Sequence, residues 1–240
     1  MNNIKKLTAI LSIVLIAGLG IFGLSCSGSK NVNSSSVQTT NAQVESPAGT
    51  PAAAADKVPP SLAAAGELGE NIYDAVKIGN WKTARAKLTE LKASAEKISA
   101  LKVGSADFAA AVTKLESAAA ANDKTATLVN ANLITLEVAN LTAKFNPPVP
   151  VEVVKLDYYG RELEIWSEAK DETKLLETAK MIRQNWDAVK GKIDAKGGKK
   201  VAAVFEALVV KTDAAKTPAE FSKLAKPILD EVDNLEKVFG

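Results

Sequence analysis

The chemically richest part of the chain is a short segment, residues 155–166, in which two tyrosines, an arginine and a tryptophan lie close together. Only 5 % of the residues in the chain are aromatic, so this concentration stands out. Tyrosine, tryptophan and arginine are the residues that most often anchor interfaces. We therefore take Tyr158, Tyr159, Arg161 and Trp166 as the candidate binding residues.

Helical spacing divides this segment into an inner and an outer face. Asp157 and Arg161 are one turn apart and can form an ion pair, and Tyr158 and Arg161 are expected near the rim. The stripe expected to face the core consists of Leu156, Tyr159, Leu163 and Trp166. Two interpretations stay open. The segment either binds a partner, or is a helix that packs through its aromatic side chains and carries one ion pair.

The side chains that most enzymes and metal sites need are missing. The chain has no histidine, a single cysteine, Cys26, and only two methionines. This composition excludes a Ser-His-Asp triad, imidazole-ligated haem and an ordinary zinc site. We therefore expect no cofactor, no metal site and no enzymatic activity.

Carboxylates alone could still bind a hard cation or cleave glycosidic bonds. Acidic residues crowd the last predicted helix, at Asp230, Glu231, Asp233 and Glu236. The apolar stripe of that helix directs most of them outward, so we interpret them as a solvated face. A carboxylate-dependent enzyme remains the less favoured alternative.

The elements that position these residues are all predicted to be helices. Apolar residues recur every three or four positions beyond Pro60, and no segment alternates as a strand would. Helix starts are indicated by Asn80, Asp171 and the capping box Thr217-Pro218-Ala219-Glu220. The predicted helices cover roughly 61–78, 80–102, 105–121, 124–145, 151–169, 171–194, 198–215 and 217–239.

The proline-rich stretch Asn146–Pro150 divides these helices evenly, because consecutive prolines stop a helix. We expect two antiparallel helical-bundle halves, residues 61–146 and 147–240. The halves are candidates for an internal repeat, since a shift of 91 positions places Gly69 on Gly160 and Leu91 on Ile182. The alternative is that two amphipathic patterns fall into phase by chance.

Residues 26–60 differ in composition from everything after them. They are rich in Ser, Asn, Thr, Ala and Pro and contain almost no large apolar residue. Such a stretch cannot bury enough surface to offset its ordering entropy. We expect a flexible, disordered tether with a reach of about 30 Å.

The first 25 residues have the features of an export signal: Lys5 and Lys6, then an apolar run from Leu7 to Leu24. The following Leu24-Ser25-Cys26 resembles the lipobox of bacterial lipoproteins. That resemblance implies that residues 1–25 are removed and that Cys26 carries the acyl chains, palmitate among them. Gly23 departs from the usual pattern. Cleavage after Ser25 without lipidation and an uncleaved membrane anchor therefore stay open.

Charge restricts the partners of the mature chain. The 30 basic residues less Lys5 and Lys6 leave 28, which equals the 28 acidic residues. A neutral chain does not favour nucleic acid. The one basic cluster, Lys196-Gly197-Gly198-Lys199-Lys200, is interpreted as a solvated loop, with contact to an anionic surface as the alternative.

Together these features predict an all-helical extracytoplasmic lipoprotein, anchored to the cell membrane or outer membrane through lipid on Cys26. Its expected role is a non-catalytic binding or interaction module that engages an envelope protein or another envelope component. The alternative is a sensory bundle that binds a small molecule near Tyr159, Trp166 and Trp186.

Overall fold

The computed structural model describes residues 57–240. The predicted export signal, Cys26 and most of the predicted tether lie outside these residues. Within residues 57–240 the chain contains helices and connections but no strand. The prediction of an all-α fold is confirmed.

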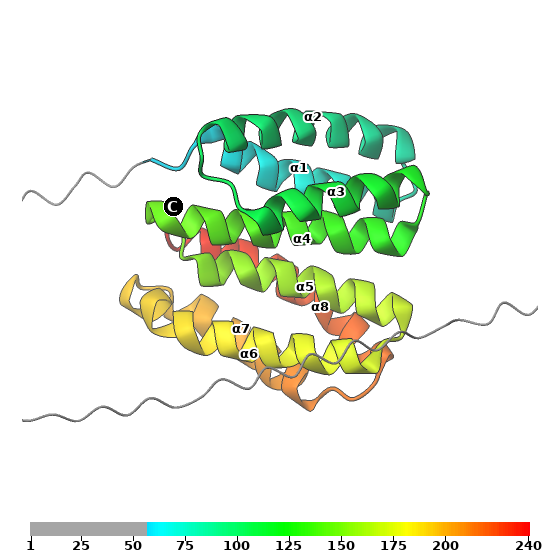
Figure 1. Ribbon diagram of the computed structural model, residues 1–240. Helices are drawn as coiled ribbons and strands as arrows, with labels where there is room; N and C mark the ends of the chain where they lie inside the picture. Colours follow the sequence, from blue (N-terminus) through cyan, green and yellow to red (C-terminus); the bar gives the residue numbers. More distant parts are fainter. Residues whose placement is uncertain (1–56) are drawn as a thin grey trace, which may run out of the picture. The chain divides into compact units, whose positions relative to one another are not determined.

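Eight α-helices follow one another with short connections (Figure 1). They are α1 (Pro60–Lys77), α2 (Trp81–Ala100), α3 (Ala106–Ala120), α4 (Lys124–Thr142), α5 (Val151–Ala169), α6 (Glu172–Ala195), α7 (Lys199–Ala214) and α8 (Pro218–Glu236), with a 3₁₀ turn at Ala143–Phe145. Every predicted helix is present, and the ends differ from the prediction by a few residues. None of the helices in this part of the chain is both long and apolar enough to span a membrane.

The predicted helix starts are confirmed because their signals are local. The Asn80 side chain accepts a hydrogen bond from the Thr83 amide at 3.2 Å, and Asp171 accepts one from the Lys174 amide at 3.0 Å. Thr217 begins α8 with a complete capping box. Each of these side chains satisfies a backbone amide that the helix itself leaves free.

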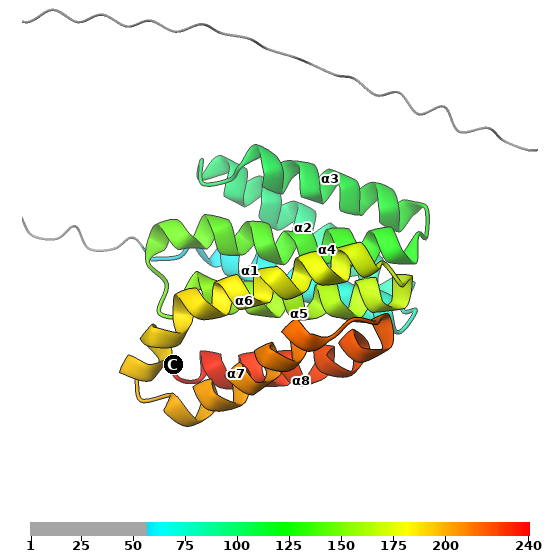
Figure 2. The same ribbon diagram turned by 90° about the horizontal axis from the view of Figure 1, so that it is seen from below.

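The helices form two groups with the same order of neighbours. In the first, α1 packs on α2 and α4, and α3 packs on α2 and α4. In the second, α5 packs on α6 and α8, and α7 packs on α6 and α8. The two groups meet where α5 lies against α4, in the middle of the molecule (Figures 1 and 2).

Each half has a core of its own. The first is built from α1 to α4 around residues such as Ile72, Leu91 and Ile134, and the second from α5 to α8 around Trp186 and Phe205. The cores are joined through α5. Ile165 belongs to the core of the first half, and the neighbouring Trp166 packs against both cores.

Two glycines lie where neighbouring helices of each half come into close contact. A methyl group on Gly69 would lie 3.1 Å from the carbonyl oxygen of Ala131 in α4. A methyl group on Gly160 would lie 2.7 Å from Cδ2 of Leu229 in α8. Both contacts are tighter than most that a side chain makes, and the two glycines lie 91 residues apart.

Candidate functional site

The four candidate residues all lie on α5, which has neighbours on every side. No residue from Val151 to Ser167 is exposed, because α5 packs on α4, α6 and α8. The expectation that Arg161 lies near the rim is wrong, since only 12 % of its side chain is exposed. Sequence spacing identified one buried face of this helix, whereas the structure buries the other face as well.

Arg161 connects the two halves through carboxylates of α1. Its Nε donates to Asp157 Oδ2 at 2.9 Å, which confirms the predicted ion pair within α5. Its terminal nitrogens lie 3.4 Å from Glu70 Oε2 and 3.5 Å from Asp74 Oδ1. The guanidinium also lies over the ring of Tyr73, 5.2 Å from its centre. A planar, always charged group with several donors is well suited to this arrangement.

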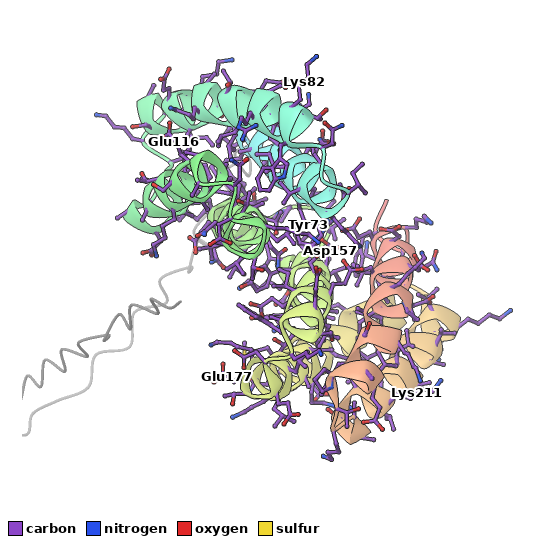
Figure 3. The ribbon with its side chains drawn as sticks, turned by 90° about the vertical axis from the view of Figure 1, so that its right-hand side faces the viewer. Tyr73, Lys82, Glu116, Asp157, Glu177 and Lys211 are labelled. Atoms are coloured by element: carbon purple, nitrogen blue, oxygen red, sulfur yellow. The ribbon has the colours of Figure 1, made fainter. Side chains whose placement is uncertain are left out.

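A second connection lies one turn further along α5. The Tyr73 hydroxyl donates to Glu164 Oε2 at 3.0 Å, and Lys77 Nζ lies 2.7 Å from the same oxygen. Burial, followed by the charge of Glu164, raises the pKa of Tyr73, so its hydroxyl stays protonated and able to donate. Tyr73 and Asp157 are seen together between the two bundles in Figure 3.

Glu162 accepts hydrogen bonds from several other polar side chains near the segment. Its Oε1 accepts from the Tyr158 hydroxyl at 3.0 Å and from Trp166 Nε1 at 3.3 Å, and its Oε2 accepts from the Thr178 hydroxyl at 3.2 Å. Burial and the charge of Glu162 raise the pKa of Tyr158. Tyr158 and Trp166 are therefore both fixed by one carboxylate that also ties α5 to α6.

Tyr159 and the backbone of Tyr158 complete the central contacts. Tyr159 is buried in the second core and meets the Tyr158 ring edge to face, with 5.0 Å between ring centres. The Tyr158 carbonyl accepts a hydrogen bond from Nδ2 of the buried Asn132 at 2.9 Å, across the α4–α5 contact. This bond fixes the register of α5 against α4.

Two of the contacts at this junction join residues at the same separation in the sequence. Glu70 and Arg161 are 91 positions apart (161 − 70), and so are Tyr73 and Glu164 (164 − 73). The offset is the one that relates Gly69 to Gly160. Residues related by the offset of the predicted repeat thus lie in contact at the junction.

Glu70 is a carboxyl group of this cluster whose pKa is strongly raised. Burial raises the pKa of Glu70 to about 7, although the charge of Arg161 opposes the shift. The side chain still exposes 46 % of its area, so water also reaches this carboxyl group.

The carboxylates of α8 remain largely on the outside, as predicted. Asp230 and Asp233 are exposed, and Glu231 and Glu236 are partly covered. Among residues 57–240, no group of three or more acidic or cysteine side chains is arranged to hold a metal ion. The acidic residues of α8 thus do not converge on one point.

A small apolar hollow lies beside the junction of the halves. Its volume is about 230 Å³, and its polar wall consists of Glu70, Thr135 and Thr142. The apolar wall comes from α1, α4, the connection after α4 and the start of α5, namely Gly66, Val138, Ala139, Pro147, Pro148, Val149, Val151 and Val154. Trp186, near which a small molecule was expected, is completely buried, and its ring centre lies 4.8 Å from that of Phe205.

Comparison of the chain with protein-family models, curated proteins and solved structures gives no match.

Sequence reasoning did not identify Tyr73, Glu162 and Glu164 as parts of this cluster. Tyr73 lies in the other half of the chain, and nothing local to it indicates its partner. One feature of the sequence could have indicated the central position of α4: residues 125–143 contain a single charged residue, Glu137. A helix without a polar face is expected to be buried on all sides, which places α4 at the centre and α5 beside it.

Proposed function

We propose that the protein is a lipid-anchored, extracytoplasmic helical lipoprotein that acts as a non-catalytic binding or interaction module of the cell envelope. The anchor is proposed from the apolar run Leu7–Leu24 and the lipobox that ends at Cys26. The helical part would be held outside the membrane by residues 27–59, with lipid on Cys26 as its attachment.

The observation that carries the non-catalytic role is the use of the polar side chains on α5. Arg161 engages three carboxylates, and Glu162 accepts hydrogen bonds from three donors of the same chain. Arg161 thereby joins the two bundles, and Glu162 ties α5 to α6. Both groups have little hydrogen-bonding capacity left for a substrate. A rigid double bundle of this kind suits a protein that presents surfaces to partners.

The anchor is tested by metabolic labelling with radioactive palmitate. We expect the parent protein and a Ser29→Ala control to incorporate label, and Cys26→Ser to incorporate none. Equal labelling of Cys26→Ser would refute lipidation at this residue. Crosslinking in intact cells would then test the interaction. Discrete adducts should form with the parent and be lost with Cys26→Ser, which no longer stays at the membrane.

The hollow beside Glu70 favours a second function, the binding of a small molecule. Drug-sized ligands occupy pockets of roughly 300–1,000 Å³, so 230 Å³ admits only a small one. Apolar walls with one carboxyl group suit an alkyl chain with a terminal amine. We expect hexylamine to raise the melting temperature more than hexanol at pH 8, and Glu70→Gln to remove the difference. Equal effects of the two compounds on the parent would refute this function.

A further inference from the structure

One end of the double bundle contains the point at which the chain leaves for the predicted tether. The beginning of α1, the α2–α3 and α4–α5 connections, the α6–α7 turn and the end of α8 all lie at this end, on the left of Figure 1. We call it the tether end. It consists of these connections with one helical turn on each side, residues 57–63, 97–109, 139–154, 192–202 and 233–240.

The tether end is basic, whereas the opposite end is neutral. The tether end has nine lysines, namely Lys57, Lys97, Lys102, Lys144, Lys192, Lys196, Lys199, Lys200 and Lys237, against five acidic residues, Asp107, Glu152, Asp194, Asp233 and Glu236. The opposite end, bounded in the same way as residues 74–84, 117–127, 166–175 and 211–221, has seven lysines and seven acidic residues. The side chains thus give +4 at one end and zero at the other.

The excess positive charge is concentrated at the turn between α6 and α7. Lys196, Lys199 and Lys200 are exposed and form no ion pair with any of the described residues 57–240. Lys199 and Lys200 also occupy the first turn of α7, where the helix dipole does not favour positive charge, and no acidic residue accompanies them. Asp194, the one acidic residue among residues 192–202, forms no ion pair with them, so this segment keeps an excess of positive charge.

The same end presents apolar surface beside its lysines. Leu101 is 55 % exposed and precedes Lys102 in the α2–α3 connection. Val201, Val238 and Phe239 are partly exposed near the α6–α7 turn and the end of α8. Lysines with scattered apolar side chains are the combination that suits the headgroup region of a bilayer.

We infer that the tether end docks on the anionic lipid headgroups of the membrane to which Cys26 is attached. The inference rests on the proposed lipid anchor. Each lysine close to an anionic surface contributes about 1 kcal/mol, and the attraction vanishes beyond about 10 Å. A predicted tether with a reach of about 30 Å keeps the basic end at high local concentration near the surface, so a weak attraction suffices.

Docking would give the module a defined orientation. The helices would run away from the membrane, and the neutral end, with the α1–α2, α3–α4, α5–α6 and α7–α8 connections, would face outward. A partner would then meet that end or the sides of the bundle.

The test uses the lipidated full chain in vesicles of neutral phosphatidylcholine or of phosphatidylcholine with about one-third phosphatidylglycerol. Lysine acetylation is followed by mass spectrometry. We expect Lys196, Lys199 and Lys200 to react several-fold more slowly on the anionic vesicles, and the protection to disappear at high salt. Lys82 and Lys211 at the opposite end serve as internal controls and should react equally on both vesicles.

Charge reversal supplies the matched comparison. Changing Lys196, Lys199 and Lys200 together to Glu should remove the protection of Lys102 and Lys144 on anionic vesicles. The same change at Lys82, Lys211 and Lys216, three lysines of the opposite end, should leave it intact. Circular dichroism of both variants verifies that they remain helical.

The possible results distinguish a failure of the proposed lipid anchor from a failure of the proposed docking. A parent chain that does not float with neutral vesicles would refute the anchor. A chain that floats with both vesicles but shows equal acetylation on them would refute the docking alone. Protection of the α6–α7 lysines already on neutral vesicles would indicate burial against a second copy of the chain, and would also overturn the inference.

Discussion

Replacing Gly69 by alanine tests whether the approach of α1 to α4 depends on the missing side chain. The new methyl group would lie 3.1 Å from the backbone oxygen of Ala131 and 3.1 Å from Cγ2 of Ile134. A backbone oxygen cannot rotate away, and the side chain of Ile134 is branched and buried. Either the helices separate or the local contacts are strained.

Two effects of opposite sign determine how much Gly69→Ala changes the free energy of unfolding. Alanine in place of glycine inside a helix stabilises by about 1 kcal/mol. Overpacking a tight contact costs about 1–3 kcal/mol. We therefore expect Gly69→Ala to lower the free energy of unfolding by about 1 kcal/mol.

Two other helical glycines are matched controls. Gly191 in α6 has no neighbour within 4 Å of a built methyl group, so Gly191→Ala should stabilise by about 1 kcal/mol. Gly66, one turn before Gly69 in α1, would place its methyl group at an ordinary 3.4 Å from Val138, so Gly66→Ala should also stabilise. All three variants gain helix propensity from alanine, and they differ only in how closely the new methyl group meets its neighbours.

Urea unfolding of the purified variants measures the three free energies of unfolding. An unchanged m-value verifies that each variant exposes the same surface on unfolding as the parent. The expected separation between Gly69→Ala and Gly191→Ala is about 2 kcal/mol. If Gly69→Ala stabilises as much as Gly191→Ala, the close approach imposes no requirement for glycine and the packing argument fails.

Three further predictions follow from single side chains. Trp186→Ala should lower the free energy of unfolding by about 3–5 kcal/mol in denaturant titrations, because Trp186 is completely buried; a loss below about 1 kcal/mol would contradict the packing described. Hydrogen bonds, first from Lys190 and then from Trp186, lower the pKa of Glu206 to about 2, so its ionised form is favoured in the folded state. The parent should therefore be more stable than Glu206→Gln by about 1–2 kcal/mol above pH 4.5, and urea midpoints should converge as the pH falls toward 2. Thr217→Ala should cost about 1 kcal/mol in thermal unfolding through loss of the α8 capping box, whereas Thr173→Ala, at an exposed position in the first turn of α6, should be close to neutral.

The helices were predictable because their signals lie within a few residues of each other. Asn80, Asp171 and Thr217 each cap the helix that follows, and the apolar stripes of α2, α6 and α8 repeat at helical spacing. The proline-rich connection after α4 likewise marks the boundary between the halves.

The junction of the halves could not be predicted in the same way. The contact between Tyr73 and Glu164 joins residues 91 positions apart, and its geometry depends on how two complete bundles pack. The segment around Arg161 was correctly identified as unusual, and the ion pair with Asp157 was predicted because it is local. The carboxylates of Glu70 and Asp74 that complete the site come from α1 and were missed.

The position of Ile165 has a consequence for the independence of the two halves. This residue is encoded in the second half but fills the interior of the first, so a fragment that ends at the proline-rich connection would lack part of its own core. Such a fragment would also expose the face of α4 that α5 covers, and we expect it to aggregate when produced alone. The first half is therefore expected to fold only together with α5.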